Sequence, residues 1–363
     1  MSRSERAGGI AAVLVVDDSV FMRRMISDMI GRFPGFRVVG VAADGQEALR
    51  RMDELDPDVV TLDIEMPRLD GFGVLERVMS SRARPIVVLS AYTEAGSEAA
   101  LRALDLGAVD FVAKPSGPVS FDVAKVEARL YEALQAACAA DIEVLARERV
   151  QREARHVRPA TLENEAAVAI AASTGGPRAL TYILGSLPAN LGAAVLVVQH
   201  MPAGFTRTLA TRLAQVSAMP VTEASGGESV AANRVWIAPG DFHMRVRRVG
   251  HEVRIALDQR DLICGTRPAA DALFASVAEA YAERCVGVVL TGMGRDGAAG
   301  LAAIRAANGR TLAQDRATSV VYGMPGRAVE EGAAEQVVPL EKIPAAVVEC
   351  LCSLSAPASG QWP

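Results

Sequence analysis

Short apolar runs alternate with amphipathic segments between residues 10 and 136, and this alternation constrains the fold more than any other feature. The apolar runs are AAVLVV, RVVGVA, VVTL, PIVVLS and DFVA, and the amphipathic segments begin near Ser19, Gly45, Gly71, Thr93 and Phe121. Parallel strands must be joined by crossover connections, which are usually helices. The pattern therefore predicts a parallel sheet covered by helices on both faces.

Three acidic residues stand where strands of this predicted sheet end. Asp17 and Asp18 follow the first apolar run, and Asp63 follows the third. Carboxylates that meet at one sheet edge repel one another unless a cation neutralises them, and all-oxygen ligation with open positions suits Mg²⁺. Lys114, after the fifth run, supplies a positive charge, and Ser90, at the end of the fourth, supplies a hydroxyl.

A second reactive stretch spans Ala167–Leu180 and reads AVAIAASTGGPRAL. Its apolar run stops at Ser173, and Gly175 and Gly176 allow a sharp turn before Pro177, which suits the first turn of a helix. Taken alone, the stretch is equally consistent with a tight turn that carries a helix-capping side chain. It nevertheless places a serine at a strand end beside a helix N-terminus, where free N–H groups can stabilise negative charge.

Two further strand-like runs supply partners for that serine. AAVLVVQH ends at His200, and VGVVLT continues into GMGRDG, which contains Asp296. A nucleophile, a general base and an orienting acid at three strand ends of one sheet predict a Ser-His-Asp triad. The chain order differs from those of the well-known serine hydrolases, and Ala171 breaks the G-x-S-x-G motif, so an ordinary α/β-hydrolase is not expected.

Composition and charge narrow the class of protein. The chain has 363 residues, half of them hydrophobic, which is enough for two well-buried domains. A net charge of -5 without a basic block argues against a nucleic acid partner. The five cysteines show no metal-binding spacing and no run approaches membrane-spanning length. We therefore expect a cytoplasmic protein with reduced thiols, no signal peptide and no membrane insertion.

The same patterns give domain boundaries. We expect a first domain at residues 10–136 and a second at 165–352. The charged segment 137–164, which includes His156, is predicted to be a solvated, partly helical linker. The tail 353–363 is predicted to be disordered.

The first domain resembles a two-component receiver domain, on the motifs VVDDS, TLDIEMP, VLSA and DFVAKP. The resemblance implies a flavodoxin-like fold in which Asp63 accepts a phosphoryl group that Ser90 and Lys114 contact. Phe111 matches the aromatic position whose rotamer changes on activation. The Mg²⁺ ligands that the resemblance implies are Asp17, Asp18, Asp63 and the main-chain carbonyl of Glu65.

The second domain is similar to the catalytic domain of chemotaxis protein-glutamate methylesterases. The motifs that carry this resemblance are ASTGGP, VQHMP, IAPGDFHM, GTRPAADALF, LTGMGRDG and AQDRATSVVYGMP. It implies a second doubly wound, mainly parallel α/β domain that hydrolyses methyl esters of chemoreceptor glutamates, and in many members also deamidates receptor glutamines. The implied partners are methyl-accepting chemotaxis receptors as substrate and a chemotaxis histidine kinase as phosphodonor.

Carried over by residue, the resemblance makes Ser173 the nucleophile, His200 the base and Asp296 the orienting acid. The chemistry of these residues by itself requires no metal or organic cofactor in the hydrolase domain. One departure is Ala171, where the family usually has Gly, which would cost about 1 kcal/mol if that position needed a positive φ. The residues expected to stabilise the oxyanion or to lie beside the site are Met293, through its backbone N–H, and Thr174, Gly175 and Gly176.

Two other functions compete with hydrolysis. Gly292, Gly294 and Gly297 spell G-x-G-x-x-G after a strand, and Asp315 follows at the spacing of a ribose-binding acid. A dinucleotide-binding enzyme is disfavoured because this fingerprint normally opens its domain. The third hypothesis is a receiver that controls a binding module without catalytic activity, for which Ser173 would be dispensable.

Overall fold

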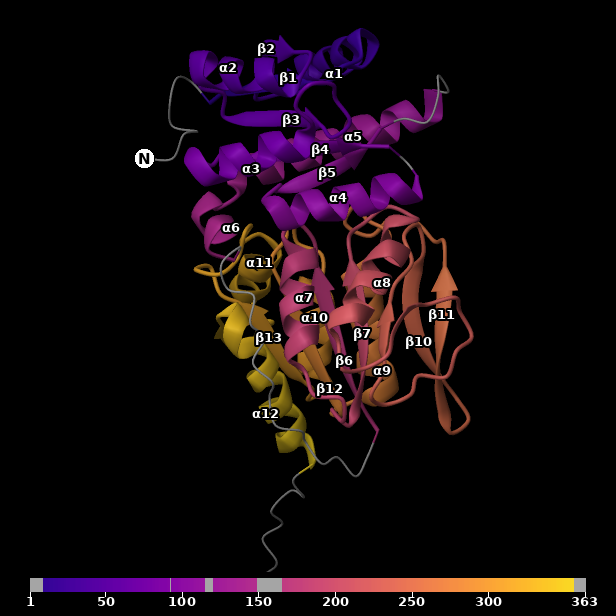
Figure 1. Ribbon diagram of the computed structural model, residues 1–363. Helices are drawn as coiled ribbons and strands as arrows, with labels where there is room; N and C mark the ends of the chain where they lie inside the picture. The colour runs from indigo at the N-terminus through magenta and orange to yellow at the C-terminus, as the bar shows by residue number, and fades with distance from the viewer. Residues whose placement is uncertain (1–8, 92, 115–119, 149–164, 356–363) are drawn as a thin grey trace, which may run out of the picture. The chain divides into compact units, whose positions relative to one another are not determined.

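The computed structural model describes residues 9–91, 93–114, 120–148 and 165–355. The chain divides into two compact units, Met1–Gln151 and Arg152–Pro363. His156, most of the predicted linker and the tail from residue 356 lie outside the described residues. Each unit is an α/β fold (Figure 1).

The first unit contains a parallel five-stranded sheet in the order β2-β1-β3-β4-β5. Its strands are β1 (Ala11–Val16), β2 (Phe36–Ala42), β3 (Val59–Asp63), β4 (Ile86–Ser90) and β5 (Asp110–Ala113). Its helices are α1 (Val20–Arg32), α2 (Gly45–Leu55), α3 (Gly71–Ser81), α4 (Glu94–Leu106), α5 (Ser120–Ala139) and α6 (Ile142–Glu148). The predicted parallel sheet is confirmed.

Side-chain caps explain why the first four helices begin where the sequence predicts. Ser19, Asp44, Asp70 and Thr93 each stand before a helix and accept a hydrogen bond from a backbone N–H of its first turn. Such caps satisfy donors that the helix itself leaves without a partner. Because β1 lies between β2 and β3, the sheet changes winding direction there, and this brings the ends of β1 and β3 together.

The start of the predicted linker is packed rather than solvated. Helix α5 continues to Ala139, and α6 buries Val144 and Leu145. The burial of these two apolar side chains favours a packed helix over a solvated segment. Helix α12 (Ile343–Ser355) likewise passes the expected boundary at residue 352.

The second unit contains a parallel seven-stranded sheet in the order β14-β13-β12-β6-β7-β9-β8. Its strands are β6 (Ala166–Ala172), β7 (Ala193–Gln199), β8 (Val221–Glu223), β9 (Val235–Ile237), β12 (Cys285–Val289), β13 (Arg310–Gln314) and β14 (Gln336–Val338). A separate antiparallel pair comprises β10 (His243–Val249) and β11 (Glu252–Asp258). The remaining helices are α7 (Gly176–Ser186), α8 (Phe205–Val216), α9 (Ala270–Tyr281), α10 (Ala298–Ala306), α11 (Met324–Glu330) and the 3₁₀ helix η2 (Leu340–Lys342).

Strand β6 stands at the centre of this sheet, with β7 on one side and β12 on the other. All three strands are fully buried, which explains their continuous apolar sequences. Ala171 lies within β6 opposite Val198 and Val289, so the position is an ordinary strand position that tolerates alanine. The winding direction changes between β6 and β12, and open α/β sheets bind ligands at such switch points.

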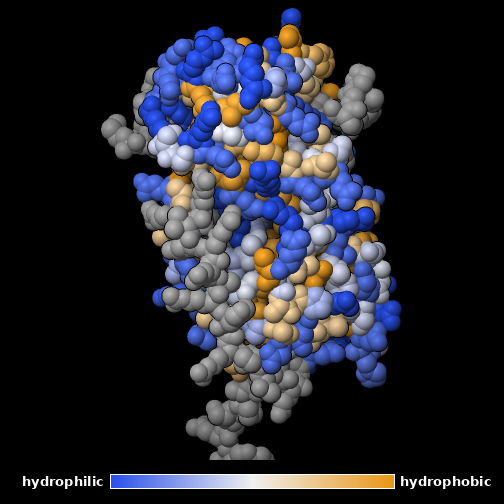
Figure 2. All heavy atoms as spheres, viewed as in Figure 1, coloured by the Kyte–Doolittle hydropathy of each residue, from blue (hydrophilic) through white to orange (hydrophobic). Residues whose placement is uncertain are grey.

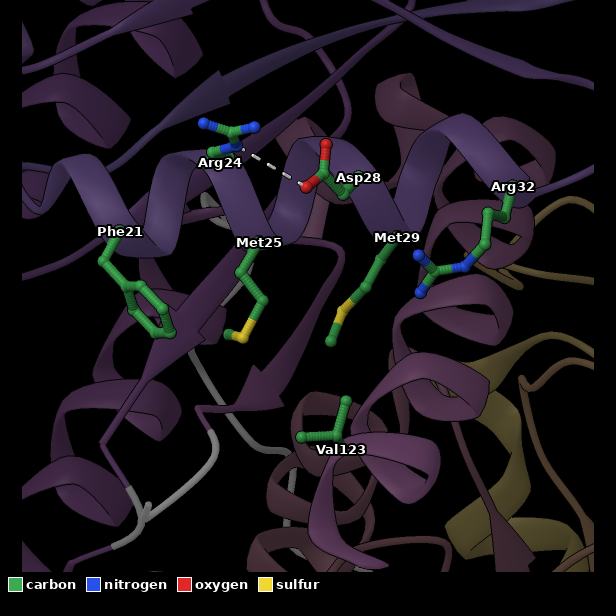
Figure 3. Close-up of a pocket in the computed structure, with 7 residues that line it drawn as sticks. All are labelled: Phe21, Arg24, Met25, Asp28, Met29, Arg32 and Val123. Atoms are coloured by element: carbon green, nitrogen blue, oxygen red, sulfur yellow. Dashed lines mark ion pairs between the residues drawn. The ribbon is translucent and has the colours of Figure 1, made fainter. Parts of the chain in front are cut away.

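Hydrophilic residues predominate on the face shown in Figure 2. A groove of about 330 Å³ lies between α1 and α5 in the first unit, with Phe21 and Met25 on one side and Val123 on the other (Figure 3). It is lined by none of the acidic residues predicted to bind Mg²⁺. Among the described residues, no helix is both long and apolar enough to cross a membrane.

Candidate active site and phosphoacceptor site

Ser173 lies in the turn between β6 and α7. Its backbone N–H donates to the carbonyl of Thr291 (3.0 Å), and its own carbonyl accepts from the N–H of Gly176 (2.7 Å). Gly175 has φ +80°, and a Cβ there would stand 2.8 Å from Cβ of Val320. Glycine is therefore required at position 175 on both conformational and steric grounds.

His200 and Asp296 form a direct pair at the same sheet edge. The His200 N–H donates to the carbonyl of Ala172 (3.0 Å), so His200 continues the ladder beside the residue that precedes Ser173. His200 Nε2 lies 2.7 Å from Asp296 Oδ2. Burial alone would raise the pKa of Asp296, but its bonds with His200 and with backbone N–H groups lower it. Asp296 therefore stays ionised and can stabilise an imidazolium.

The orientation of the His200 ring determines which of its two nitrogens can accept a proton. Nε2 is engaged by Asp296, and Thr266 Oγ1 lies 3.5 Å from the same nitrogen. A neutral imidazole that donates from Nε2 accepts a proton at Nδ1. In this geometry Nδ1 is therefore the nitrogen of His200 that can accept a proton, as the predicted role of general base requires.

The loop after β12 packs directly against the serine. A Cβ on Gly292 would stand 2.6 Å from Cβ of Ser173, so only glycine allows this approach. The Gly292 carbonyl accepts from the N–H groups of Gly323 (3.1 Å) and Met324 (2.8 Å), which anchors the loop. The next residue of this loop is Met293, whose backbone N–H is predicted to stabilise the oxyanion.

Sequence reasoning overlooked two buried polar residues that join these segments. Gln199 Nε2 donates to the carbonyls of Ser173 (2.9 Å) and His200 (3.2 Å). Thr291 Oγ1 donates to the Thr174 carbonyl (3.0 Å) and accepts from the backbone N–H of Val321 (3.0 Å). Each is a polar residue at the end of an apolar strand run next to a predicted site residue, and that signal could have identified both.

In the first unit, Lys114 joins two of the predicted acids. Its Nζ lies 2.8 Å from Asp17 Oδ2 and 2.7 Å from Asp63 Oδ2. Burial raises the pKa of Asp63, and the Asp17 charge adds to this, although the bonds with Lys114 act in the opposite direction. Carboxylate oxygens of Asp17, Asp18 and Asp63 lie within 4.8 Å of one another. One lysine does not neutralise three acids, and this oxygen donor set fits a divalent cation.

The other predicted receiver residues lie just after β3 (Glu65), at the end of β4 (Ser90) and within β5 (Phe111). The Glu65 N–H donates to Asp63 Oδ1 (3.4 Å), and the Lys114 N–H donates to the Ser90 carbonyl (2.7 Å). Ser90 Oγ donates to the carbonyl of Gly96 in α4 (2.7 Å). Phe111 is buried. Ser90 is therefore bonded to the first turn of α4 in this conformation.

Comparisons with known proteins identify the family of each unit. The CheB methylesterase family model matches residues 168–347, and the response regulator receiver domain model matches residues 13–124. A protein-glutamate methylesterase/protein-glutamine glutaminase of Symbiobacterium thermophilum is 48% identical over 361 residues, which cover 96% of this chain and 99% of the relative.

The chain belongs to the CheB methylesterase family.

A relative and a solved structure from Thermotoga maritima extend the comparison. Its protein-glutamate methylesterase/protein-glutamine glutaminase is 42% identical, over 94% of this CheB-family chain and 98% of the relative. The crystal structure of the CheB methylesterase catalytic domain from that organism is 44% identical with a TM-score of 0.51, and the match covers 51% of this chain and 98% of that one.

The dinucleotide-binding alternative is not favoured, either by these relatives or by the structure of the glycine motif. Asp271 Oδ1 accepts from the N–H groups of Gly297 (3.0 Å) and Gly300 (2.7 Å) at the N-terminus of α10. A pyrophosphate would need those donors. Asp315 instead accepts from the N–H and the hydroxyl of Thr318 within a local turn.

We expect Asp63→Asn to stabilise the receiver unit of this CheB-family chain at neutral pH. Because the folded state raises the pKa of Asp63, ionised Asp63 destabilises that state. This penalty is present above the raised pKa and disappears as the pH falls towards the ordinary value of 3.8. Calorimetry of the full chain should therefore show a higher unfolding temperature for the variant at pH 7, and a smaller difference at acid pH. A lower unfolding temperature at pH 7 would contradict the prediction.

Proposed function

We propose that this CheB-family chain is a receiver-controlled hydrolase that removes methyl esters from glutamate side chains of chemotaxis receptors. The observation that carries the proposal is the 2.7 Å contact of His200, just after β7, with Asp296, in the loop after β12, because β7 and β12 are the two neighbours of the strand β6 that ends before Ser173. Asp296 fixes the tautomer of His200, the proposed base, and stabilises the imidazolium that forms when His200 accepts a proton. A binding module would not need a serine and a base held in this way.

The reaction follows from the placement of these groups. Ser173 Oγ attacks the ester carbonyl carbon while His200 Nδ1 takes the hydroxyl proton, and the Met293 N–H stabilises the tetrahedral oxyanion. When the intermediate collapses, His200 returns the proton to the methoxide, which leaves as methanol. Water then attacks the acyl-enzyme by the same steps in reverse and releases the glutamate carboxylate and Ser173.

The same site has what is needed to deamidate glutamine. An amide gives the same tetrahedral oxyanion, and the imidazolium of His200 protonates the leaving nitrogen as ammonia instead of methoxide. Asp296, with its lowered pKa, stabilises the imidazolium in both reactions. We therefore extend the proposal to receptor glutamines.

In the receiver unit, Asp63 is the proposed phosphoryl acceptor and a histidine kinase the proposed donor. Asp17, Asp18, Asp63 and the Glu65 carbonyl would hold Mg²⁺, which when bound neutralises charge on the phosphoryl oxygens. Lys114 already lies 2.7 Å from Asp63 Oδ2 and adds a fixed positive charge. Ser90 and Phe111 would respond to the new charge. The Ser90 hydroxyl must leave the Gly96 carbonyl before it can donate to a phosphoryl oxygen. We place these reactions in the cytoplasm, where such kinases act.

The direct test is methanol release from methylated receptor membranes, with and without a small-molecule phosphodonor. We expect release in both conditions and faster release with the phosphodonor. Deamidation is measured on the same membranes from ammonia release by receptors that carry glutamine at those positions. A full chain that releases no methanol in either condition would overturn the proposed function.

A fragment that begins at residue 160 is expected to be active without a phosphodonor, and more active than the unphosphorylated full chain. The hydrolase residues all belong to the second unit, so the receiver is not needed for the chemistry. An activation of about 10-fold to 100-fold corresponds to about 1.4 to 2.7 kcal/mol, within the range of ordinary allosteric coupling. The control is the phosphorylated full chain. A folded fragment no more active than the unphosphorylated chain would show that the receiver helps to build or present the site.

A further inference from the structure

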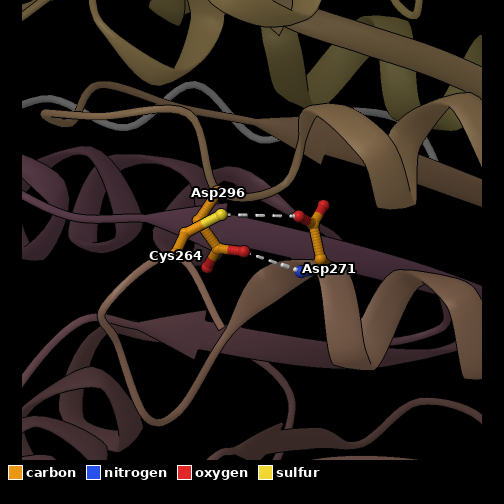
Figure 4. Close-up of side chains that lie close together, drawn as sticks. All are labelled: Cys264, Asp271 and Asp296. Atoms are coloured by element: carbon orange, nitrogen blue, oxygen red, sulfur yellow. Dashed lines mark hydrogen bonds between the residues drawn. The ribbon is translucent and has the colours of Figure 1, made fainter. Parts of the chain in front are cut away.

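A second acidic residue, Asp271, lies next to Asp296, the orienting acid of the proposed triad. Cys264, Asp271 and Asp296 offer ligand atoms within 4.8 Å of one another (Figure 4). Both oxygens of Asp296 and Oδ1 of Asp271 are engaged by backbone N–H groups or His200, so the bonds of this cluster point to a structural use of the carboxylates. Asp271 Oδ2 faces Cys264 Sγ at 4.0 Å.

These two carboxylates cap each other's helices. The N-cap residues of α9 and α10 are Ala269 and Gly297, and neither makes a side-chain cap. Asp296, which precedes α10, accepts from the first-turn N–H groups of Ala270 (2.6 Å) and Asp271 (3.0 Å) in α9.

The exchange is reciprocal. Asp271, in the first turn of α9, accepts from Gly297 and Gly300 at the start of α10. Four donors that would otherwise lack a partner are satisfied in this way. The two helices also approach closely, since a Cβ on Gly300 would stand 2.6 Å from Cβ of Phe274.

We propose that Asp271 is a positioning residue for the proposed hydrolysis, because it holds the segment 296–300 so that Asp296 stays aligned with His200. The Asp271 side chain touches none of the reacting groups and bonds to the N–H of Gly297, the residue after Asp296, while the Asp271 backbone N–H donates to Asp296 Oδ1 in any variant. Burial raises the pKa of Asp271, and the neighbouring Asp296 charge adds to this. The N–H groups of Gly300 and Gly297 act in the opposite direction on this pKa, but both bond to the single oxygen Oδ1, so an uncharged acceptor of the same shape should serve as well as the carboxylate.

The test compares Asp271→Ala with Asp271→Asn in the full chain with phosphodonor. Asparagine keeps a carbonyl oxygen for Gly297 and Gly300 and places its amide towards Cys264, whereas alanine removes the acceptor. We expect Asp271→Ala to lower kcat for methanol release about tenfold or more with little change in KM, because small misplacements of catalytic groups are costly. Asp271→Asn should restore most of kcat.

Ser276→Ala is the matched control for stability. Ser276 is a buried residue of the same helix, and its hydroxyl contacts the Val246 N–H and the Leu273 carbonyl, away from the triad. This variant should lower the unfolding temperature and leave kcat unchanged. The inference is wrong if Asp271→Ala keeps kcat within about twofold of wild type, or if Asp271→Asn is no better than Asp271→Ala.

A second measurement does not depend on the proposed substrate. The His200 Nε2 proton bonded to Asp296 should give a low-field proton resonance that is absent from His200→Ala. We expect Asp271→Ala to lose or shift this resonance and Asp271→Asn to keep it. If the wild-type chain releases no methanol, the proposed function is wrong, but the resonances of the two variants still test the positioning role. An unchanged resonance in Asp271→Ala would overturn that role.

Discussion

Replacing Ser173 with alanine is expected to lower methanol release from methylated receptors by about 10⁴-fold or more, because the variant has no nucleophile to form the acyl-enzyme. His200→Ala should have a loss of similar size, since an unactivated serine hydroxyl attacks an ester slowly. Ser186→Ala is the control. Ser186 is a buried serine of α7 whose hydroxyl donates only to the Tyr182 carbonyl within the helix, so its removal should leave turnover unchanged.

The double variant Ser173→Ala/His200→Ala should be scarcely slower than either single variant, because triad members serve the same step. Asp296→Asn should also be severe. It removes the charge that stabilises the imidazolium and alters the acceptor for His200 Nε2. Turnover is measured as initial rates of methanol release at saturating receptor, after folding has been checked by thermal unfolding. A folded Ser173→Ala protein with more than a tenth of wild-type release would rule out this nucleophile.

Asp63→Asn is expected to abolish phosphorylation of the chain by small-molecule phosphodonors. The wild-type chain should gain one phosphate in the presence of Mg²⁺. The amide of the variant cannot form the acyl phosphate, although Asp17 and Lys114 remain beside it. Intact-mass spectrometry after exposure to the phosphodonor measures the phosphate directly, and chelation with EDTA should suppress it in the wild type.

The matched control for Asp63 lies at the other end of the same strand. Asp58 directly precedes β3, and its Oδ2 accepts from the backbone N–H of Ala12 (2.8 Å). Asp58→Asn should therefore be phosphorylated as well as the wild type. Undiminished labelling of Asp63→Asn would mean that another residue accepts the phosphoryl group.

Much of the fold could be predicted from local sequence. Strand positions were readable because continuous Val, Ile and Ala runs suit strands buried on both faces. Helix starts were readable because Ser19, Asp44, Asp70 and Thr93 are caps that bond to residues only two or three positions away. The parallel sheets alone predicted that the site residues would come together, because the carboxyl ends of parallel strands lie at the same edge of a sheet.

The alignment of those residues was decided only by tertiary contacts. Gln199 reaches Ser173 across 26 residues, and Thr291 reaches Thr174 across 117. Asp271 and Asp296 exchange caps across 25 residues. Periodicity and propensity describe neighbours along the chain, so they cannot select the partner of a polar atom on a distant segment.

The sequence by itself therefore determined the strands, the helix starts and the residue types at the sheet edges, because each of these depends on side chains a few positions apart. Only the tertiary structure decided that His200 turns Nε2 to Asp296 and leaves Nδ1 for the serine proton. It also decided that residues 142–148 pack as a helix instead of forming part of a solvated linker. Both outcomes depend on which surfaces come into contact once the sheets have formed. The order of the strands in each sheet brings those surfaces together, and that order is a property of the whole unit.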